Sequence, residues 1–286
     1  MTVTVPRHEF PAEEAARRAE RLDKSAQRKI ESLEQSPEDF DRAFTTSLNA
    51  ALTHCGADPR AAKLPTWEAF VSAMQVSSAL FAAATSNEET IERRIGHEPR
   101  TIRATGPTSA TDAGTWIAAF FLAVICREQD RMTELAKVPI SLMRASGAEY
   151  DEYIYAWVDT LQTWWLQGGD IGPKLLAAMN GTDPEVARIA DREAMLRLIY
   201  PPINLFYRYV LRDHDSFNAE LANAVKWHKD YWTKDEGRAI DCAGWVAFEP
   251  LAIACMAYDA GFPIEVESEY LPKHLLVRSR VGELDT

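Results

Sequence analysis

The chain has 286 residues, of which 47% are hydrophobic and 26% are charged, and it carries a net charge of −12. This composition is typical of a folded globular protein and excludes an intrinsically disordered chain. Residues 111–286 contain 27 acids and 17 bases, a net of −10. Such an acidic surface repels nucleic acid and suits a basic protein partner, although acidity for solubility alone is also common.

Helical patterns follow one another along nearly the whole chain. Residues 1–11 are expected to form a loose arm, and residues 12–34, rich in Ala, Glu and Arg, favour an exposed or edge helix. Ser36, Thr66 and Asp183 each stand beside a proline where a helix N-cap is expected. Further helices are predicted over residues 38–55, 66–85, 87–95, 112–136, 149–167, 171–180, 185–199, 202–211, 214–234 and 243–260.

Extended structure is expected at one place only, the alternating segment near residues 263–268. Residues 96–110 are the longest stretch without periodicity, and we expect a loop there within one domain. One short strand cannot form a sheet. The sequence therefore predicts an all-α fold, with antiparallel helix pairs in one large helical domain over residues 1–286. Such pairs could also stack in a solenoid-like manner, although no sequence period supports a repeat.

The N-terminus, the apolar segments and the cysteines indicate the cellular setting. The four cysteines are widely spaced and form no C-x-x-C pair, which is typical of buried, reduced and unreactive thiols. The first residues lack the basic and apolar regions of a signal peptide. The most apolar window, residues 114–126, is too short to cross a bilayer. We therefore expect a soluble cytoplasmic protein that does not bind a membrane.

Sequence signatures of catalysis and of metal binding are missing. No two histidines have the spacing of a helical zinc or di-iron site, and the G-x-S-x-G elbow and the phosphate-binding P-loop are both absent. The acidic groups at 149–153 and 213–215 look like helix starts, where carboxylates favour the positive end of the helix dipole. The sequence thus predicts no catalytic residue, no cofactor and no metal.

The stretch "AVKWHKDYW" (224–232) combines one histidine, two lysines and three large aromatic side chains. On a helix, Leu221, Val225, His228 and Trp232 share one face, and Trp227 lies on the adjoining face. We therefore predict a helix-packing element rather than a reaction centre or a nucleic-acid contact. This prediction places Trp227 and Trp232 mostly in the interior, with Lys226 and Lys229 exposed.

Residues 223–276 carry a resemblance to a known family. The run "HKDYW", the acidic Asp241 before a Gly- and Ala-rich apolar helix, the helix end "AYDAG" and the segment "ESEYLP" together resemble the C-terminal half of the immunity protein 49 family. The clear match covers about a fifth of the chain. These bacterial proteins are thought to neutralise the toxin of a polymorphic-toxin system, so the resemblance implies a non-enzymatic protein that binds a toxin.

The family-like residues themselves favour a structural role. Gly244 and the alanines 247, 252, 254 and 257 would allow the apolar helix to approach its neighbours closely, including the face that carries Trp227 and Trp232. Gly261 is expected to end this helix, and Pro263 prevents its continuation. Close packing and a stop signal do not describe a catalytic site.

The resemblance implies a cognate protein toxin as the partner, and the charge favours a basic one. Two clusters of acids with tyrosines are the predicted contact surfaces: Glu149, Tyr150, Asp151, Glu152 and Tyr153, and Glu265, Glu267, Glu269 and Tyr270. The alternative is a helical enzyme that acts on a small apolar substrate in an aromatic pocket. Its candidate lining residues are Trp157, Trp164, Trp165, Tyr200, Phe206, Tyr207 and Tyr209.

Overall fold

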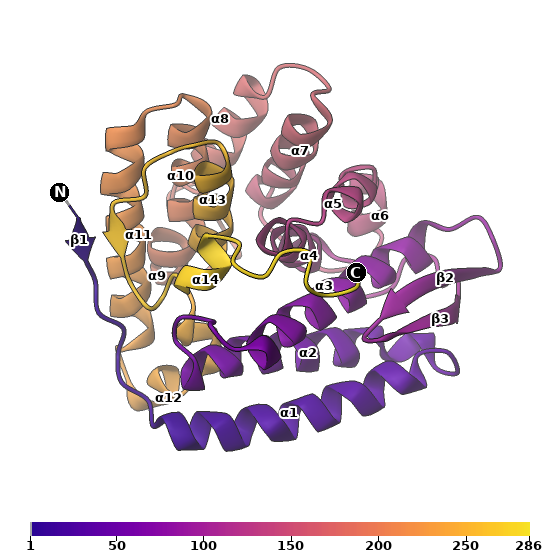
Figure 1. Cartoon of the computed structure of the whole chain (residues 1–286). Helices are drawn as coiled ribbons and strands as arrows, with labels where there is room; N and C mark the ends of the chain where they lie inside the picture. Colours follow the sequence, from indigo (N-terminus) through magenta and orange to yellow (C-terminus); the bar gives the residue numbers. More distant parts are fainter. Residues whose placement is uncertain (1) are drawn as a thin grey trace.

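The structure, a computed structural model, describes residues 2–286 and is mostly helical (Figure 1). The all-α prediction is confirmed, since the sheets are limited to two short strand pairs. The helices are α1 (Ala12–Ser32), α2 (Phe40–Ala57), α3 (Leu64–Thr85), α4 (Ala113–Cys126), α5 (Gln129–Ala136), α6 (Ile140–Arg144), α7 (Tyr153–Leu166), α8 (Gly172–Gly181), α9 (Arg192–Ala194), α10 (Tyr200–Val210), α11 (His214–Trp232), α12 (Glu236–Ala239), α13 (Phe248–Asp259) and α14 (Lys273–Leu276). The strands are β1 (Val3–Thr4), β2 (Thr90–Ile95), β3 (Glu98–Arg103) and β4 (Val266–Glu267).

Helices α1, α2 and α3 lie side by side along one edge of the molecule (Figure 1). As expected for an edge helix, α1 buries only a narrow stripe, which consists of Ala15, Ala19, Ala26 and Ile30. The alanines bring α1 close to α2 because they add little bulk between the two backbones. Thr66 does not cap α3, which begins earlier at Leu64; the threonine hydroxyl instead donates to Asp58 at 2.8 Å.

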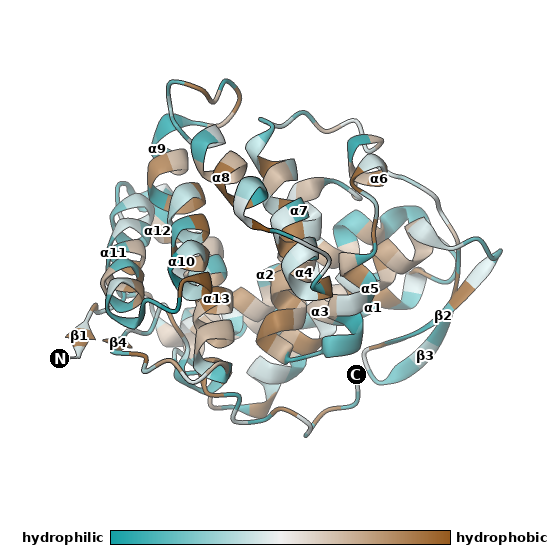
Figure 2. Ribbon diagram, turned by 90° about the horizontal axis from the view of Figure 1, so that it is seen from above, coloured by the Kyte–Doolittle hydropathy of each residue, from teal (hydrophilic) through white to brown (hydrophobic). Residues whose placement is uncertain are grey.

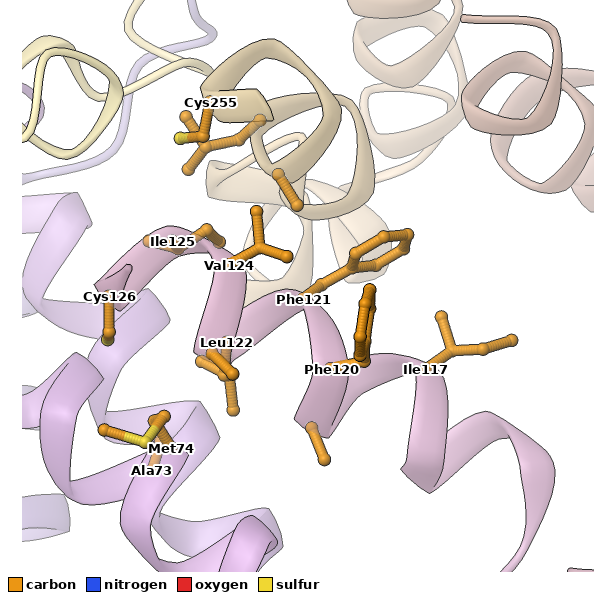
Figure 3. Packing of buried hydrophobic residues seen from close by; sticks show 14 of the residues in the cluster. Ala73, Met74, Ile117, Phe120, Phe121, Leu122, Val124, Ile125, Cys126 and Cys255 are labelled. Carbon is orange, nitrogen blue, oxygen red and sulfur yellow. The ribbon is translucent and has the colours of Figure 1, made fainter. Parts of the chain in front are cut away.

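The centre of the core is α4, which is buried on nearly all sides. Its most apolar stretch runs from Trp116 to Cys126. Figure 2 shows hydrophobic residues gathered in the middle of the molecule. Figure 3 shows α4 between Met74 of α3 on one side and Cys255 of α13 on the other. A helix that is apolar all round must be surrounded by other elements. The most apolar segment of the sequence is therefore the middle of the hydrophobic core.

The helix predicted over residues 112–136 is in fact two helices, α4 and α5. The break is at Arg127, whose backbone is in the left-handed conformation with φ of 63°. Its guanidinium donates to the carbonyls of Leu275 and Leu276, at 2.8 and 2.7 Å, and its Nε donates to Asp259 at 3.0 Å. This arginine therefore connects the end of α4 to α13 and α14, a long-range contact that local periodicity does not encode.

The helix predicted over residues 87–95 is wrong, and the loop predicted over 96–110 is wrong at residues 98–103, whereas residues 104–110 are irregular as predicted. Residues 90–95 and 98–103 form the antiparallel hairpin β2–β3, with Ile95 opposite Glu98. Gly96 has φ of 71° and is the first residue of the two-residue turn, the place where such a turn favours glycine. Ile95 and Ile102 are buried by α3 and its neighbours. The alternating "TIERRI" and "TIR" around "GH" would have indicated the hairpin.

The helix predicted from residue 185 begins later than expected. After one turn at residues 183–187, the chain is irregular until α9 begins at Arg192, where the Asp191 side chain caps the backbone N–H of Ala194. A side chain from another part of the chain holds the irregular residues 188–190 in place. The carboxylate of Asp151 accepts hydrogen bonds from the backbone N–H groups of residues 188, 189 and 190, at 2.7 to 3.2 Å. A tertiary contact thus overrides the local helical preference.

The N-terminal strand β1 pairs with β4, which lies in the segment expected to be extended. Val3 and Thr4 of β1 pair in parallel with Val266 and Glu267 of β4. Val5 is buried, so the N-terminal arm is attached to the body over these residues. At the end of α13, Gly261 has φ of 85°, as predicted for a residue that ends a helix.

Candidate partner-binding surfaces

The stretch 224–232 lies within α11, and its side chains are placed partly as predicted. His228 is buried and Lys226 is exposed. Trp227 and Trp232 are mostly buried, as predicted, although each keeps a partly exposed edge. Lys229 is half-buried because its ammonium group donates to the carbonyl of Pro6 at 2.8 Å. The stretch packs against the N-terminal arm as well as against α13.

His228 has a structural environment rather than a catalytic one. Its Nε2 lies 3.0 Å from the carbonyl oxygen of Gly244, so Nε2 carries a proton and donates it. Its ring meets the ring of Tyr270 edge to face, with centroids 5.1 Å apart. Burial lowers the pKa of His228 to about 4, so the imidazole is neutral near pH 7. A neutral, buried donor to a backbone carbonyl holds α11 against the segment before α13.

The close helix approach predicted for Gly244 is confirmed. A Cβ atom on Gly244 would lie 2.8 Å from Cγ and 2.9 Å from Cβ of Trp232. The alanines at 247, 252, 254 and 257 are all fully buried. The residues that carry the family resemblance are therefore a packing motif.

All four cysteines are buried and free, as predicted. Burial raises the pKa of Cys126 to about 12 and that of Cys255 to about 11. A thiol with so high a pKa is protonated at neutral pH and is a poor nucleophile. These side chains behave as small apolar groups of the core.

The first predicted contact cluster, residues 149–153, is largely used within the protein. Tyr153 is buried, and the hydroxyl of Tyr150 donates to Asp112 at 2.7 Å. Asp151 holds residues 188–190, as described above, and Glu152 forms an ion pair with Arg144 at 2.6 Å. The exposed carboxylates of this cluster are those of Glu149 and Glu152. Contact with a partner through them stays a prediction.

The second predicted cluster is divided between surface and core. Glu265, Glu267 and Glu269 are exposed, because β4 turns Val266 inward and its neighbours outward. Tyr270 is fully buried, with its hydroxyl 2.7 Å from Nδ1 of His8. Its side chain is therefore inaccessible to a partner in this conformation. Of this cluster, three glutamates remain as candidate contacts.

The aromatic residues of the alternative enzyme prediction pack mainly against one another. The ring of Phe206 lies edge to face with Trp157, at a centroid distance of 5.2 Å, and with Trp164, at 5.5 Å. Tyr209 continues the cluster to Phe262 of the C-terminal region. Trp157 and Phe206 belong to the core, the other five residues are partly buried, and none of the seven lines either cavity described below.

Two features are absent from residues 2–286. No group of three or more His, Cys, Asp or Glu side chains is placed to hold a metal ion. Within the same residues, no helix combines the length and the apolar character needed to cross a membrane.

A cleft that the sequence did not indicate opens between α1, α2 and α3. It has a volume of about 340 Å³ and is closed at one side by the hairpin turn 96–98 and by residues 284–285. Five carboxylates line it, from Asp23, Glu31, Glu68, Glu98 and Asp285. These acids come from four separate segments of the chain, so no local motif could have indicated them. We refer to this feature as the acidic cleft.

A second cavity, of about 630 Å³, lies between the end of α3, β2, α5 and residues 137–142. An ion pair between Arg93 and Glu134, at 3.2 Å, crosses its surface. These two charges offset each other, and Lys137 adds a further positive charge to the lining.

These observations describe a mostly helical protein with buried thiols, a histidine in a structural role and an acidic cleft. A family model described as immunity protein 49 matches residues 58–275, well over half of the chain, so the chain belongs to the immunity protein 49 family. The matched range extends far upstream of the residues that first carried the resemblance. No curated protein and no solved structure matches the chain.

Proposed function

We propose that this chain is a non-catalytic immunity protein that binds a cognate polymorphic toxin and neutralises it by direct contact. Membership of the immunity protein 49 family is the observation that carries the proposal, because the family implies toxin neutralisation. The environments of the chemically reactive side chains agree with it. The four thiols and His228 are buried in structural roles, and the aromatic cluster is packed.

The toxin is expected to be basic at its contact surface. The chain carries a net charge of −12, and the glutamates at 149, 152, 265, 267 and 269 are exposed. Opposite charges speed the encounter of two proteins and help to align them, and added salt weakens this effect. A nuclease or another enzyme of an anionic substrate would present such a basic surface.

Co-expression with the toxin encoded beside this chain's gene tests the proposal. The two proteins are expected to co-purify as a complex, and cells that express both are expected to grow while cells that express the toxin alone die. Failure to form a complex together with failure to protect the cells would contradict the proposal. Loss of toxin activity without complex formation would instead indicate a catalytic mode of protection.

A further inference from the structure

We infer that the acidic cleft receives a basic side chain, arginine or lysine, from the cognate toxin. The inference rests on the proposed function, since it names the part of the surface that engages the toxin. Three features of the cleft carry it: its charge, an unpartnered hydroxyl in its wall, and the apolar surface beside both.

The charge of the lining is strongly one-sided. Five carboxylates face one guanidinium, that of Arg100. The positive charge of Arg100 is itself neutralised within the protein. Its guanidinium lies 3.5 Å from Glu98 and 4.0 Å from Glu34, and Glu34 is outside the cleft. Asp23 is bonded to His54 at 2.9 Å, and Asp285 lies 3.9 Å from Arg94. Acids therefore remain in excess after the internal pairs are formed.

Glu68 has the greatest capacity for an external cation. It lies in the first turns of α3, is half-buried, and makes no hydrogen bond or ion pair within residues 2–286. A carboxylate that is partly removed from water and has no partner is costly, and a cation that binds beside it recovers that cost. Glu31, which accepts only from its neighbour Gln27 at 3.0 Å, adds a second acceptor across the cleft.

Ser47 supplies independent evidence of a missing partner. The serine lines the cleft from α2 with an exposed fraction of 1%, and its hydroxyl oxygen has no hydrogen-bond partner. Buried hydroxyl groups are nearly always paired, so an unpaired one in the wall of a cavity indicates a group that arrives from outside. An ammonium or guanidinium N–H is such a donor. Ser47 accepts from it once its side chain turns toward the cleft, since its oxygen has almost no exposed surface in this conformation.

The walls fit the rest of a long basic side chain. Ala26, Ile30 and Ala50 are buried residues of the lining, and Val71 and Ile95 continue the apolar surface. Arginine and lysine bury their aliphatic stems on such surfaces while the charged end reaches polar groups. The carboxylates would repel an anion, and a wholly apolar group would leave the carboxylates without a partner. The lining therefore selects a cationic side chain with an aliphatic stem.

The cleft joins residues inside and outside the family match. Glu68 and the hairpin turn lie within residues 58–275, whereas α1, α2 and residues 284–285 lie outside them. The family match therefore covers only part of the residues that line the cleft.

The test measures binding of the full chain to a catalytically inactive form of the toxin domain encoded beside its gene, by calorimetry at two salt concentrations. Glu68→Gln keeps the size of the side chain and removes its charge. We expect it to weaken binding about tenfold to a hundredfold and to reduce the salt dependence. Ser47→Ala removes the unpaired hydroxyl, and we expect a loss of about two- to tenfold.

Two controls separate recognition from folding. Glu220 is also half-buried on a helix, α11, and lies outside the cleft, so Glu220→Gln should bind like the wild type. The melting temperature of Ser47→Ala should equal or exceed that of the wild type, because the hydroxyl has no partner to lose. A residue with a purely structural role would lower it.

The outcomes distinguish the inference from the function on which it rests. If the wild type binds the toxin and both cleft variants bind equally well, the inference is overturned and the proposed function stands. If the wild type neither binds nor protects, both are overturned. If the chain alone forms a dimer that Glu68→Gln dissociates in sedimentation, a second copy occupies the cleft and the inference is also overturned.

Discussion

Two helix-packing regions of this molecule differ in how completely they are filled. Where α11 meets the segment before α13, Gly244 lies so close to Trp232 that one added methyl group would overlap it. Between α1, α2 and α3, the helices leave a cavity of about 340 Å³ with a hydroxyl that has no partner. The first region holds the fold together, and the second has space and charge for another molecule.

The difference shows where recognition and stability reside in this chain. The run "HKDYW" and the helix that follows it carry the family resemblance, and they consist of close contacts among buried groups. The acidic cleft carries no motif, because its acids belong to distant segments. Four experiments test this contrast.

Trp245→Ala should cause the largest loss in the tightly packed region. Trp245 is fully buried, its ring lies 4.2 Å from that of Phe10, and it contacts Gly56 of α2 so closely that a Cβ there would be 2.6 Å away. Truncation of a buried tryptophan costs about 3–5 kcal/mol of the free energy of unfolding. Urea unfolding followed by circular dichroism measures this value.

The half-buried Trp227 of α11 provides the matched control. Trp227→Ala removes a side chain of the same size from the same region, but part of that side chain already contacts water. We expect a smaller loss than that caused by Trp245→Ala, because the stabilisation scales with the apolar area that is buried. Equal losses would show that the close contacts around Trp245 do not set the stability of this region.

Acid should weaken the same region through His228. Its pKa is about 4 in the folded protein and about 6.5 when unfolded, so between these values only the unfolded state binds the proton. Stability therefore falls as the pH drops from about 6.5 towards 4, by about 3 kcal/mol in total. His228→Gln should remove this part of the pH dependence. The free energy of unfolding is measured for the wild type and for His228→Gln between pH 7.5 and 5. Equal slopes against pH in the two proteins would contradict the prediction.

Gly244→Ala tests the close approach with a single methyl group. The new Cβ would overlap Trp232, and we expect a loss of about 1–3 kcal/mol because the neighbouring helices must shift. Gly168 has no atom within 4 Å of the equivalent position, so Gly168→Ala should change stability by less than about 0.5 kcal/mol. Urea unfolding of both variants measures the difference. Equal free energies of unfolding would show that the contact at Gly244 is loosely packed and would contradict the prediction.

Much of the fold was predictable because helix formation here follows local patterns. The apolar periodicity and the proline and glycine boundaries gave α2, α3, α8 and α11 to within a few residues. The wrong predictions lie where contacts with distant residues determine the backbone conformation. Arg127 ends α4 by binding the segment near residue 275, and Asp151 holds residues 188–190 out of a helix. Neither partner lies near in sequence, so the local pattern does not contain the information.

The binding surfaces were harder to predict for the same reason. Grouping acids with tyrosines along the chain selected Tyr153 and Tyr270, which the fold buries, because a sequence does not show which side of a short segment faces water. The acidic cleft draws on α1, α2, α3, the hairpin turn and the C-terminal residues. Only the packing of these elements creates it.

Ser47→Leu should have the smallest effect on stability and gives the sharpest contrast with Gly244→Ala. The larger side chain starts from a buried position in the cleft wall and extends into the cleft, removes an unpaired hydroxyl, and is favourable in a helix. We expect the free energy of unfolding to change by less than about 1 kcal/mol. Toxin binding should nevertheless weaken, because the leucine occupies the space of the incoming cation. A stability loss above about 2 kcal/mol in urea unfolding would mean that the helices close around Ser47 in solution. The cleft would then be packed like the contact at Gly244, and the distinction between the two regions would not hold.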